Sequence, residues 1–167
     1  DENGIGMKVL LVVPHQLIKN RPSIDLPLGV LYIAGYLRSN NFQGDVEIYD
    51  ANLSGQIWTD EAGNKFLGDR PEQIQKRIQE YQPDVVGISN MFTWQFSQAL
   101  LVARLCREID SNIVTVIGGP HVSSFPKETS SEPDIDYVVM GEGEIRFFEL
   151  LKAIQLGEKH QIQGVVQ

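Results

Sequence analysis

Short apolar runs alternate with amphipathic stretches along the whole chain. Runs rich in β-branched residues predict five buried strands, at residues 8–14, 45–50, 83–89, 114–117 and 135–140. Between them, apolar residues recur at helical spacing and predict helices over residues 27–38, 71–81, 94–109 and from about residue 144 onward. Strands and helices that alternate in units of about 30 residues indicate a parallel α/β sheet with right-handed crossovers.

The pattern within the strands predicts their order. Residues 8–14 are almost continuously apolar, which is typical of a central strand covered on both faces, whereas residues 45–50 alternate as an edge strand does. We therefore predict a flavodoxin-like (Rossmann-like) three-layer α/β sandwich with a five-stranded parallel sheet in the order 2-1-3-4-5. The polar, glycine-rich residues 55–68 predict a hairpin or an irregular excursion, and residues 125–131 a short helix or irregular connection.

The helical spacing also predicts which side chains are buried. The first helix should bury Val30, Leu31, Ala34 and Leu37. In the third predicted helix, Cys106 shares the inner face with apolar residues, so its thiol is expected to be packed rather than reactive. Because it is the only cysteine, it can form neither an intrachain disulfide nor an iron–sulfur cluster, and a reducing compartment is expected.

Composition narrows the class of protein. The 167 residues, 42% hydrophobic and 22% charged, suit one globular domain and exclude disordered and fibrous chains. A net charge of -8 without a basic cluster argues against a nucleic-acid partner. No apolar run reaches membrane-spanning length and no secretion signal is recognisable, so we expect no membrane contact and a cytoplasmic location. Residues 1–6 precede Met7 and are expected to be a cloning remnant.

Four loops follow the predicted strands at the edge where such a sheet binds ligands. They contain Pro14 and His15, then Ser89, Asn90, Met91, Phe92 and Thr93, then Gly118, Gly119, Pro120 and His121, and finally Gly141, Glu142, Gly143 and Glu144. The Gly118–Gly119 pair lets a ligand lie against the main chain, although a tight turn without a ligand is the alternative. Glu142 and Glu144 open a helix, where a structural role or a ligand hydrogen bond is favoured over acid–base catalysis.

Catalytic interpretations of these loops find little support. None of His15, His121 and His160 has a partner at metal-ligand spacing, and Ser89 lacks the Gly-x-Ser-x-Gly elbow. No glycine-rich phosphate motif follows a strand. The acids and the lysine of a receiver domain are missing at all three expected positions. What remains is a mostly uncharged cleft, suited to a large neutral cofactor with amide rims and an apolar body.

Four stretches carry a family resemblance. Residues 27–38, 83–89, 116–121 and 136–144, with 148–151 after the last, resemble the cobalamin-binding domain that precedes the barrel of cobalamin-dependent radical S-adenosylmethionine (SAM) enzymes. That group includes methyltransferases and magnesium-protoporphyrin IX monomethyl ester cyclases. The resemblance covers essentially the whole chain from Met7, and residues 162–166 look like the segment with which the family leaves this domain.

The resemblance implies where cobalamin would lie. The corrin would cross the carboxyl ends of the strands, and its dimethylbenzimidazole tail would enter the cleft. The residues at Ser89–Thr93 and the Gly118–Gly119 turn would line the tail, while Pro14, His15 and Gly141–Gly143 would border the tail or the corrin rim. Gly29, Pro120 and His121 complete the implied cofactor-binding set. Gly119→Val is expected to fill the slot for the tail and abolish cobalamin retention with the fold largely intact.

Two departures from related domains matter. Classical cobalamin domains carry Asp-x-His-x-x-Gly after the first strand, but residues 13–18 here keep only His15 of that motif, so no carboxylate orients it. We therefore expect base-off cobalamin without a protein histidine on cobalt and no metal-ligating residue. The single cysteine cannot form the Cys-x3-Cys-x2-Cys cluster site of the family, so this chain is not expected to be catalytic alone.

These inferences favour one function over two others. The leading interpretation is the cobalamin-binding module, residues 7–157, of a larger radical SAM enzyme, with residues 158–167 as a linker toward the barrel. That parent would also use S-adenosylmethionine and a 4Fe-4S cluster, for methyl transfer or related radical chemistry. The alternative is a degenerate flavodoxin-like domain that packs against proteins without a cofactor, with loops that close over each other. A small hydrolase or nucleotide-binding enzyme is a third interpretation.

Overall fold

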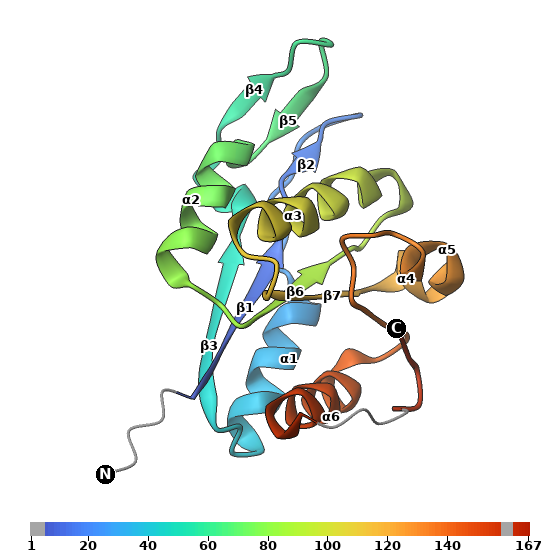
Figure 1. The fold of residues 1–167 in the computed structure, drawn as a ribbon. Helices are drawn as coiled ribbons and strands as arrows, with labels where there is room; N and C mark the ends of the chain where they lie inside the picture. Colours follow the sequence, from blue (N-terminus) through green and yellow to red (C-terminus); the bar gives the residue numbers. More distant parts are fainter. Residues whose placement is uncertain (1–5, 158–161) are drawn as a thin grey trace.

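A mostly parallel sheet forms the centre of the computed structural model, which describes residues 6–157 and 162–167 (Figure 1). Its strands are β1 (Met7–Val13), β3 (Gly44–Asp50), β6 (Val85–Ser89), β7 (Val114–Gly118), β8 (Tyr137–Val139) and β9 (Val165–Val166), in the order β3-β1-β6-β7-β8-β9. The first five are parallel and confirm the predicted order 2-1-3-4-5.

The predicted count of five strands is wrong by one, because β9 adds an antiparallel edge strand beside β8. Two valines are too short to show a strand period, and their pairing depends on a contact distant in sequence. Of the expected linker, residues 158–161 and with them His160 lie outside the described residues, as do residues 1–5 of the expected remnant.

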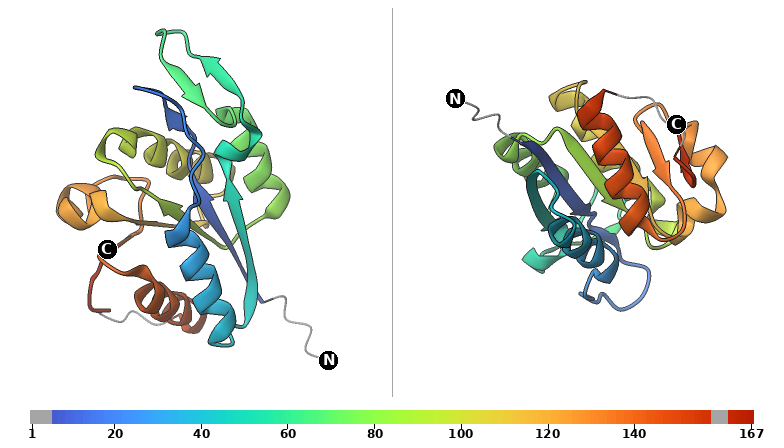
Figure 2. Two further views of the ribbon diagram at one scale, coloured as in Figure 1. Left: turned by 180° about the vertical axis from the view of Figure 1, so that it is seen from behind. Right: turned by 90° about the horizontal axis from the view of Figure 1, so that it is seen from below.

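Helices cover both faces of the sheet. α1 (Leu28–Ser39) and α6 (Gly143–Leu156) pack side by side on one face, as the view from behind shows (Figure 2). α2 (Pro71–Tyr81) and α3 (Phe96–Ile109) cover the other face. Strand β1 contributes to both layers, because Val9 and Leu11 face α1 and α6 while Leu10 and Val12 face α2 and α3.

The burial of the helices follows the predicted spacing with one exception. Val30, Ala34 and Leu37 of α1 are buried, but Leu31 is 40% exposed. With Val30 as position i, the buried residues of the helix are at i, i+4 and i+7. Leu31 is at i+1 and therefore lies on the flank of this buried face. Cys106 is packed as expected, and burial raises the pKa of its thiol to about 12.

Short elements complete the connections between the main strands and helices. They are the 3-10 turns η1 (Ala51–Ser54) and η2 (Thr93–Gln95) and the short helices α4 (Pro120–Ser124) and α5 (Pro126–Ser130). None of the helices in the described ranges is long and apolar enough to cross a membrane. The cytoplasmic location stays a prediction.

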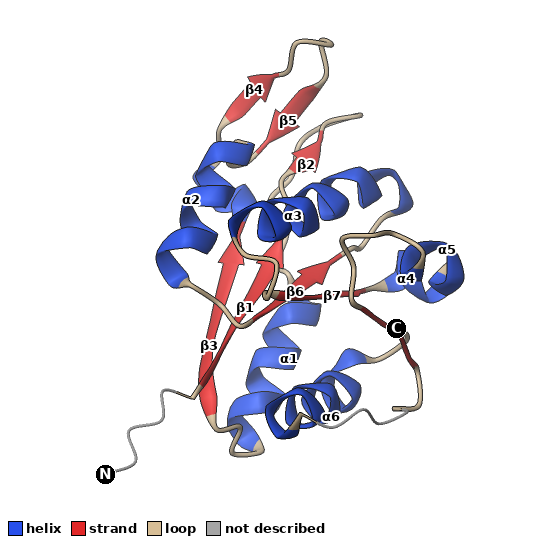
Figure 3. Cartoon of the chain, viewed as in Figure 1, coloured by secondary structure: helices blue, strands red, loops and turns tan. Residues whose placement is uncertain are grey.

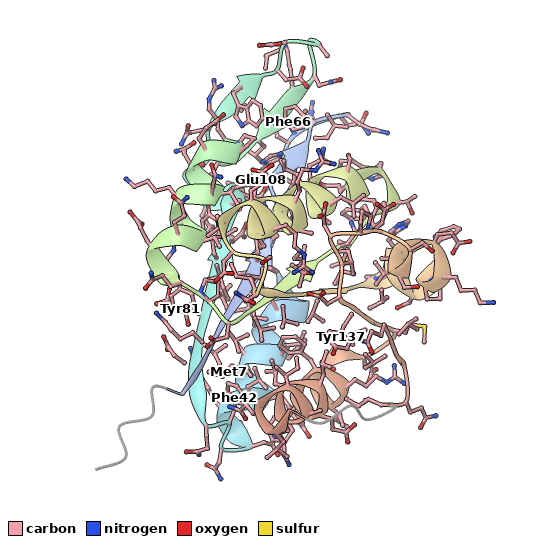
Figure 4. The ribbon with its side chains drawn as sticks, in the orientation of Figure 1. Met7, Phe42, Phe66, Tyr81, Glu108 and Tyr137 are labelled. Carbon is pink, nitrogen blue, oxygen red and sulfur yellow. The ribbon has the colours of Figure 1, made fainter. Side chains whose placement is uncertain are left out.

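An accessory sheet projects beyond the carboxyl end of β1 (Figure 3). It consists of β2 (Gln16–Leu17), β5 (Lys65–Leu67) and β4 (Ile57–Thr59), paired antiparallel in that order. The β4–β5 hairpin confirms the excursion predicted around residues 55–68. Figure 4 places Phe66 of this sheet at the opposite end of the molecule from Met7 and Phe42.

Candidate cofactor-binding site

A cavity of about 270 Å³ lies between the central sheet and the α1–α6 layer, at the carboxyl ends of the strands. We call it the slot. Strands β1, β6, β7 and β8 supply its floor, α1 and α6 its walls, and the loops its mouth. Its lining residues are Leu11, Gly29, Val30, Ile33, Gly87, Ile88, Ser89, Met91, Val116, Gly118, Gly119, Pro120, Val139, Gly141, Glu142, Gly143, Glu144 and Phe147.

Strand register sets the floor of the slot. Leu11, Gly87 and Val116 are paired across three parallel strands and form one row. Ser89, Gly118 and Val139 form the next row toward the mouth. Successive residues of a strand point to opposite faces, so these two rows, two residues apart, share the α1–α6 face. Gly118 leaves space in the second row, because a Cβ there would come no closer than 3.5 Å to its neighbours. The space beside Gly87 in the first row is filled by the side chains of Leu11 and Phe147, which would lie 2.8 and 3.2 Å from a Cβ at that position.

Gly29 and Gly118 border open space. A Cβ on Gly29, at the start of α1, would have no other group within 4 Å, and a Cβ on Gly118 would come no closer than 3.5 Å to its neighbours. Side chains at these positions would therefore extend into the slot or its mouth.

Gly119 is different, and this corrects the expected effect of its replacement. Its φ of +126° lies in a region that side-chain-bearing residues rarely adopt, and its Cβ would lie 2.8 Å from the carbonyl carbon of Asn90. Although Gly119 lines the slot, valine there would collide with the neighbouring loop rather than fill the cavity. The expectation that Gly119→Val leaves the fold largely intact is therefore wrong.

Hydrogen bonds join three of the loops at the mouth. The Asn90 N–H donates to the Gly118 carbonyl at 2.8 Å, and the Gly141 N–H donates to Ser123 Oγ at 2.8 Å. His121 is buried, with Nδ1 3.1 Å from Thr93 Oγ1 and its ring between Phe96 and Phe125. These contacts hold the loops after β6, β7 and β8 in fixed positions around the slot.

A second, smaller cavity of about 100 Å³ adjoins the slot on the β1 side, and we call it the side cavity. Three residues, Gly29, Ser89 and Met91, line both. The other lining residues of the side cavity are Val13, Pro14, Gln16, Asp25, Leu26, Pro27, Asn52, Asn90, Phe92 and Gln95. No lysine or arginine lines either cavity, so neither offers a cationic cradle for a phosphate.

His15 lines neither cavity, although its chain neighbours Pro14 and Gln16 line the side cavity. Its side chain is 2% exposed, and Nδ1 donates to the Asp69 carbonyl at 2.9 Å. Its ring meets Trp58 and Phe66 edge-on, with centroid distances of 5.3 and 5.2 Å. Burial lowers the pKa of His15 below its ordinary value of 6.5, and the hydrogen bond to Asp69 opposes this shift only in part. His15 therefore fixes the accessory sheet to the end of β1 as a neutral imidazole.

The structure brings most of the sequence-predicted residues together. The slot holds Gly29, Ser89, Met91, Gly118, Gly119, Pro120, Gly141, Glu142 and Gly143, and the side cavity adds Pro14, Asn90 and Phe92. His15, Thr93 and His121 line neither cavity. The core residues of the slot were not among the sequence-predicted site residues, and Gly87, a glycine inside a buried strand, was the available signal for them.

The lining suits an apolar heteroaromatic group. A volume of about 270 Å³ is near the lower end of small-molecule sites, which hold about 300–1,000 Å³. Its charged residues, Glu142 and Glu144, lie at the start of α6, and apart from Ser89 the floor is aliphatic or glycine. Within residues 6–157 and 162–167, no group of three or more His, Cys, Asp or Glu side chains is placed to hold a metal ion.

Comparison with known proteins gives a consistent answer. Residues 15–151 match the family described as the B12 binding domain. An uncharacterized methyltransferase, PH0819, of Pyrococcus horikoshii is 34% identical over 164 residues, which are 96% of this chain and 32% of that protein. The anaerobic magnesium-protoporphyrin IX monomethyl ester cyclase of Rubrivivax gelatinosus is 30% identical over 158 residues, 90% of this chain and 25% of that protein.

A solved structure shows the same fold. The cobalamin-dependent S-adenosylmethionine radical enzyme OxsB, with aqua-cobalamin and S-adenosylmethionine bound, superposes with a TM-score of 0.75 at 22% identity. The match covers 96% of this chain and 20% of that one. This chain thus spans about a third or less of the length of these three proteins.

Proposed function

This chain belongs to the B12 binding domain family, and from that premise we propose that it holds cobalamin with the nucleotide tail in the slot. The observation that carries the proposal is the glycine-hollowed slot between the sheet and the α1–α6 layer. Its aliphatic floor suits the flat, uncharged dimethylbenzimidazole, and its mouth opens at the sheet edge where the corrin would rest.

Different residues of the slot would make different contacts with the bound cofactor. Gly118 would allow the tail to approach the main chain of β7, and Val30, Ile33 and Phe147 would hold it by apolar contact. The Ser89 hydroxyl, between the two cavities, is placed for a polar atom of the tail. The loops tied together by Thr93 and His121 keep this geometry in place before cobalamin arrives, which reduces the ordering cost of binding.

We further propose that the bound cofactor is base-off and has no histidine of this chain on cobalt. The support is the position of His15, buried against Trp58 and Phe66 with Nδ1 engaged by Asp69. To reach a cofactor above the strand ends, this ring would have to leave its aromatic contacts and its hydrogen bond.

The larger context is also a proposal. We propose that residues 7–157 form the cobalamin module and that residues 158–167 lead toward a radical SAM domain of the same parent chain, which would hold a 4Fe-4S cluster and S-adenosylmethionine. Relatives of greater length, named as methyltransferases and as a cyclase, support this view. When bound, cobalamin would supply a cobalt centre able to carry a methyl group, and the residues here would bind and orient it.

Equilibrium titration with hydroxocobalamin, followed by absorbance, tests the proposal. We expect saturable binding with one corrinoid per chain. A folded protein that shows no spectral change and retains no corrinoid at tens of micromolar would refute it. The degenerate-domain alternative required the loops Ser89–Thr93 and Gly118–His121 to close over each other, whereas a cavity stays open between the residues that they contribute.

A further inference from the structure

The Arg146 side chain lies between two main-chain segments that are distant in the sequence. Arg146 stands near the start of α6 and is half-buried, and its guanidinium donates to the carbonyl of Met140, the residue that follows β8. The same side chain passes Gly164, which precedes β9. Arg146 thus contacts both the loop that leads into α6 and residues 162–167, which we call the C-terminal segment.

Two glycines make room for this arginine. A Cβ on Gly141 would lie 2.6 Å from Arg146 Nη1, and a Cβ on Gly164 would lie 2.5 Å from Nε and 2.6 Å from Cζ. Both glycines have a positive φ, of +68° and +82°. The guanidinium therefore lies directly against the main chain of both segments, and a side chain at either position would push it away.

Met140 joins the same two segments through its main chain. Its N–H donates to the Gly164 carbonyl at 2.8 Å, while its own carbonyl accepts from Arg146. Beyond Gly164 the segment continues into β9, which pairs antiparallel with β8. Both polar main-chain groups of Met140 are thus engaged, one by the C-terminal segment and one by the arginine that contacts this segment. Displacement of the segment would therefore disturb the loop.

The loop held in this way is part of the mouth of the slot. Gly141 follows Met140 directly, and residues 141–144 line the slot. Neither Arg146 nor the C-terminal segment lines either cavity. The segment would therefore act on the slot through the loop that Arg146 holds.

We propose that Arg146 is a positioning residue that couples the C-terminal segment to the occupancy of the slot. A ligand in the slot restricts residues 141–144, the restricted loop holds Arg146 in place, and Arg146 orders the segment. Such coupling is reciprocal, so an ordered segment also strengthens binding in the slot. The inference rests on the proposed function for the identity of the ligand. Under that function, the position of a domain that follows β9 would depend on whether the cofactor is loaded.

The first experiment needs no ligand and measures amide hydrogen exchange by nuclear magnetic resonance. Arg146→Met removes the donors, and Arg146→Lys keeps a stem of the same length with one donor. We expect the Met140 and Val165 amides to exchange at least about fivefold faster in the Met variant and within about twofold of wild type in the Lys variant. The Val114 amide, at the opposite end of the sheet, should not change. Unchanged exchange in the Met variant, or equal acceleration of all three amides, would overturn the proposal.

The second experiment tests the coupling to the slot from the C-terminal segment. Gly164→Ala should push the guanidinium away and weaken hydroxocobalamin binding at least about fivefold. Gly157→Ala is the matched control, because Gly157 also has a positive φ, of +65°, but a Cβ there would have no other group within 4 Å. It should bind within about twofold of wild type. In the Arg146→Met background, Gly164→Ala should have no further effect on binding.

The outcomes separate this inference from the proposed function. Equal affinity of the wild-type and Gly164→Ala proteins for hydroxocobalamin would overturn the coupling and leave the proposed function intact. A full effect of Gly164→Ala in the Arg146→Met background would show that the segment acts on the slot by another route. Failure of the wild-type protein to bind hydroxocobalamin would overturn the proposed function and the coupling to this ligand. The exchange experiment would still decide whether Arg146 joins the two segments.

Discussion

Gly119 lies so close to Asn90 that a Cβ on the glycine would come within 2.8 Å of the asparagine carbonyl carbon. The two residues belong to the loops after neighbouring strands β7 and β6, and the Asn90 N–H also donates to the Gly118 carbonyl. The mouth of the slot thus depends on backbone contact between loops, which a single added carbon would disrupt.

Gly119→Ala should therefore destabilise the fold by about 2 kcal/mol or more, from the strained φ of +126° and the collision with Asn90. Gly118→Ala is the control, because its Cβ would have ordinary contacts and its φ is not positive; we expect a change below about 1 kcal/mol. Urea denaturation measures both. Equal midpoints for the two variants would contradict the placement of the Gly119 loop.

Gly29→Leu should weaken cobalamin binding by at least about tenfold, because the side chain enters open space that the slot and the side cavity share. Gly35→Leu, on the same helix and equally unobstructed, lines neither cavity and should bind as the wild type does. Leucine in place of glycine favours a helix, so neither variant should unfold more easily. Absorbance titration measures the affinity for cobalamin, and thermal unfolding measures the stability of each variant. Unchanged binding in the Gly29 variant would show that the cofactor does not bind at this end of α1.

His15 should make the stability of the protein depend on pH. Burial lowers its pKa in the folded state, so below 6.5 the unfolded chain binds a proton that the folded chain does not. This contribution is complete above pH 6.5 and is lost as the pH falls toward the folded pKa, with a slope of at most about 1.4 kcal/mol per pH unit. Urea denaturation between pH 5 and 8 should show a shallower slope for His15→Asn, which retains a donor for Asp69. An unchanged slope would show that His15 is not the titrating group.

The same residue gives a spectroscopic prediction. If no histidine of this chain ligates cobalt, reduced cob(II)alamin on the protein should give an electron paramagnetic resonance spectrum without nitrogen splitting of its axial lines. His15→Asn should leave that spectrum unchanged, because His15 lines neither cavity. Nitrogen splitting in the wild type that disappears in the variant would instead place the imidazole on cobalt.

The sequence was most informative where local pattern and burial agree. The near-continuous apolar run of β1 and the alternation in β3 predicted their places in the sheet correctly, because the number of covered faces determines such patterns. Strand β9 and the β2 strand of the accessory sheet were missed. Two-residue strands carry no periodicity, and their pairing depends on contacts distant in the chain.

The position of the candidate site in the fold could be predicted from the sequence, but its size and shape could not. Glycines after strands indicated the edge of the sheet at which the slot lies, since carboxyl ends of parallel strands gather there. Whether a glycine gives space to a ligand or to a neighbouring loop depends on tertiary distances, so Gly118 and Gly119 look alike in the sequence and differ in the structure. The side-chain oxygens of Asn52 and Asn90, which have no hydrogen-bond partner among the residues that the structure describes, were equally invisible, because hydrogen-bond satisfaction exists only once the chain has folded.

The shared wall between the slot and the side cavity, formed by Gly29, Ser89 and Met91, bears on how tightly a whole ligand is held. Two covalently joined groups that occupy adjoining cavities bind as a chelate: once the first is seated, the second is present at a high effective concentration. The intact cofactor should thus bind far more tightly than a mixture of its separated corrin and nucleotide halves. The distance between the two cavities would then have to match the length of the part of the ligand that joins the two groups.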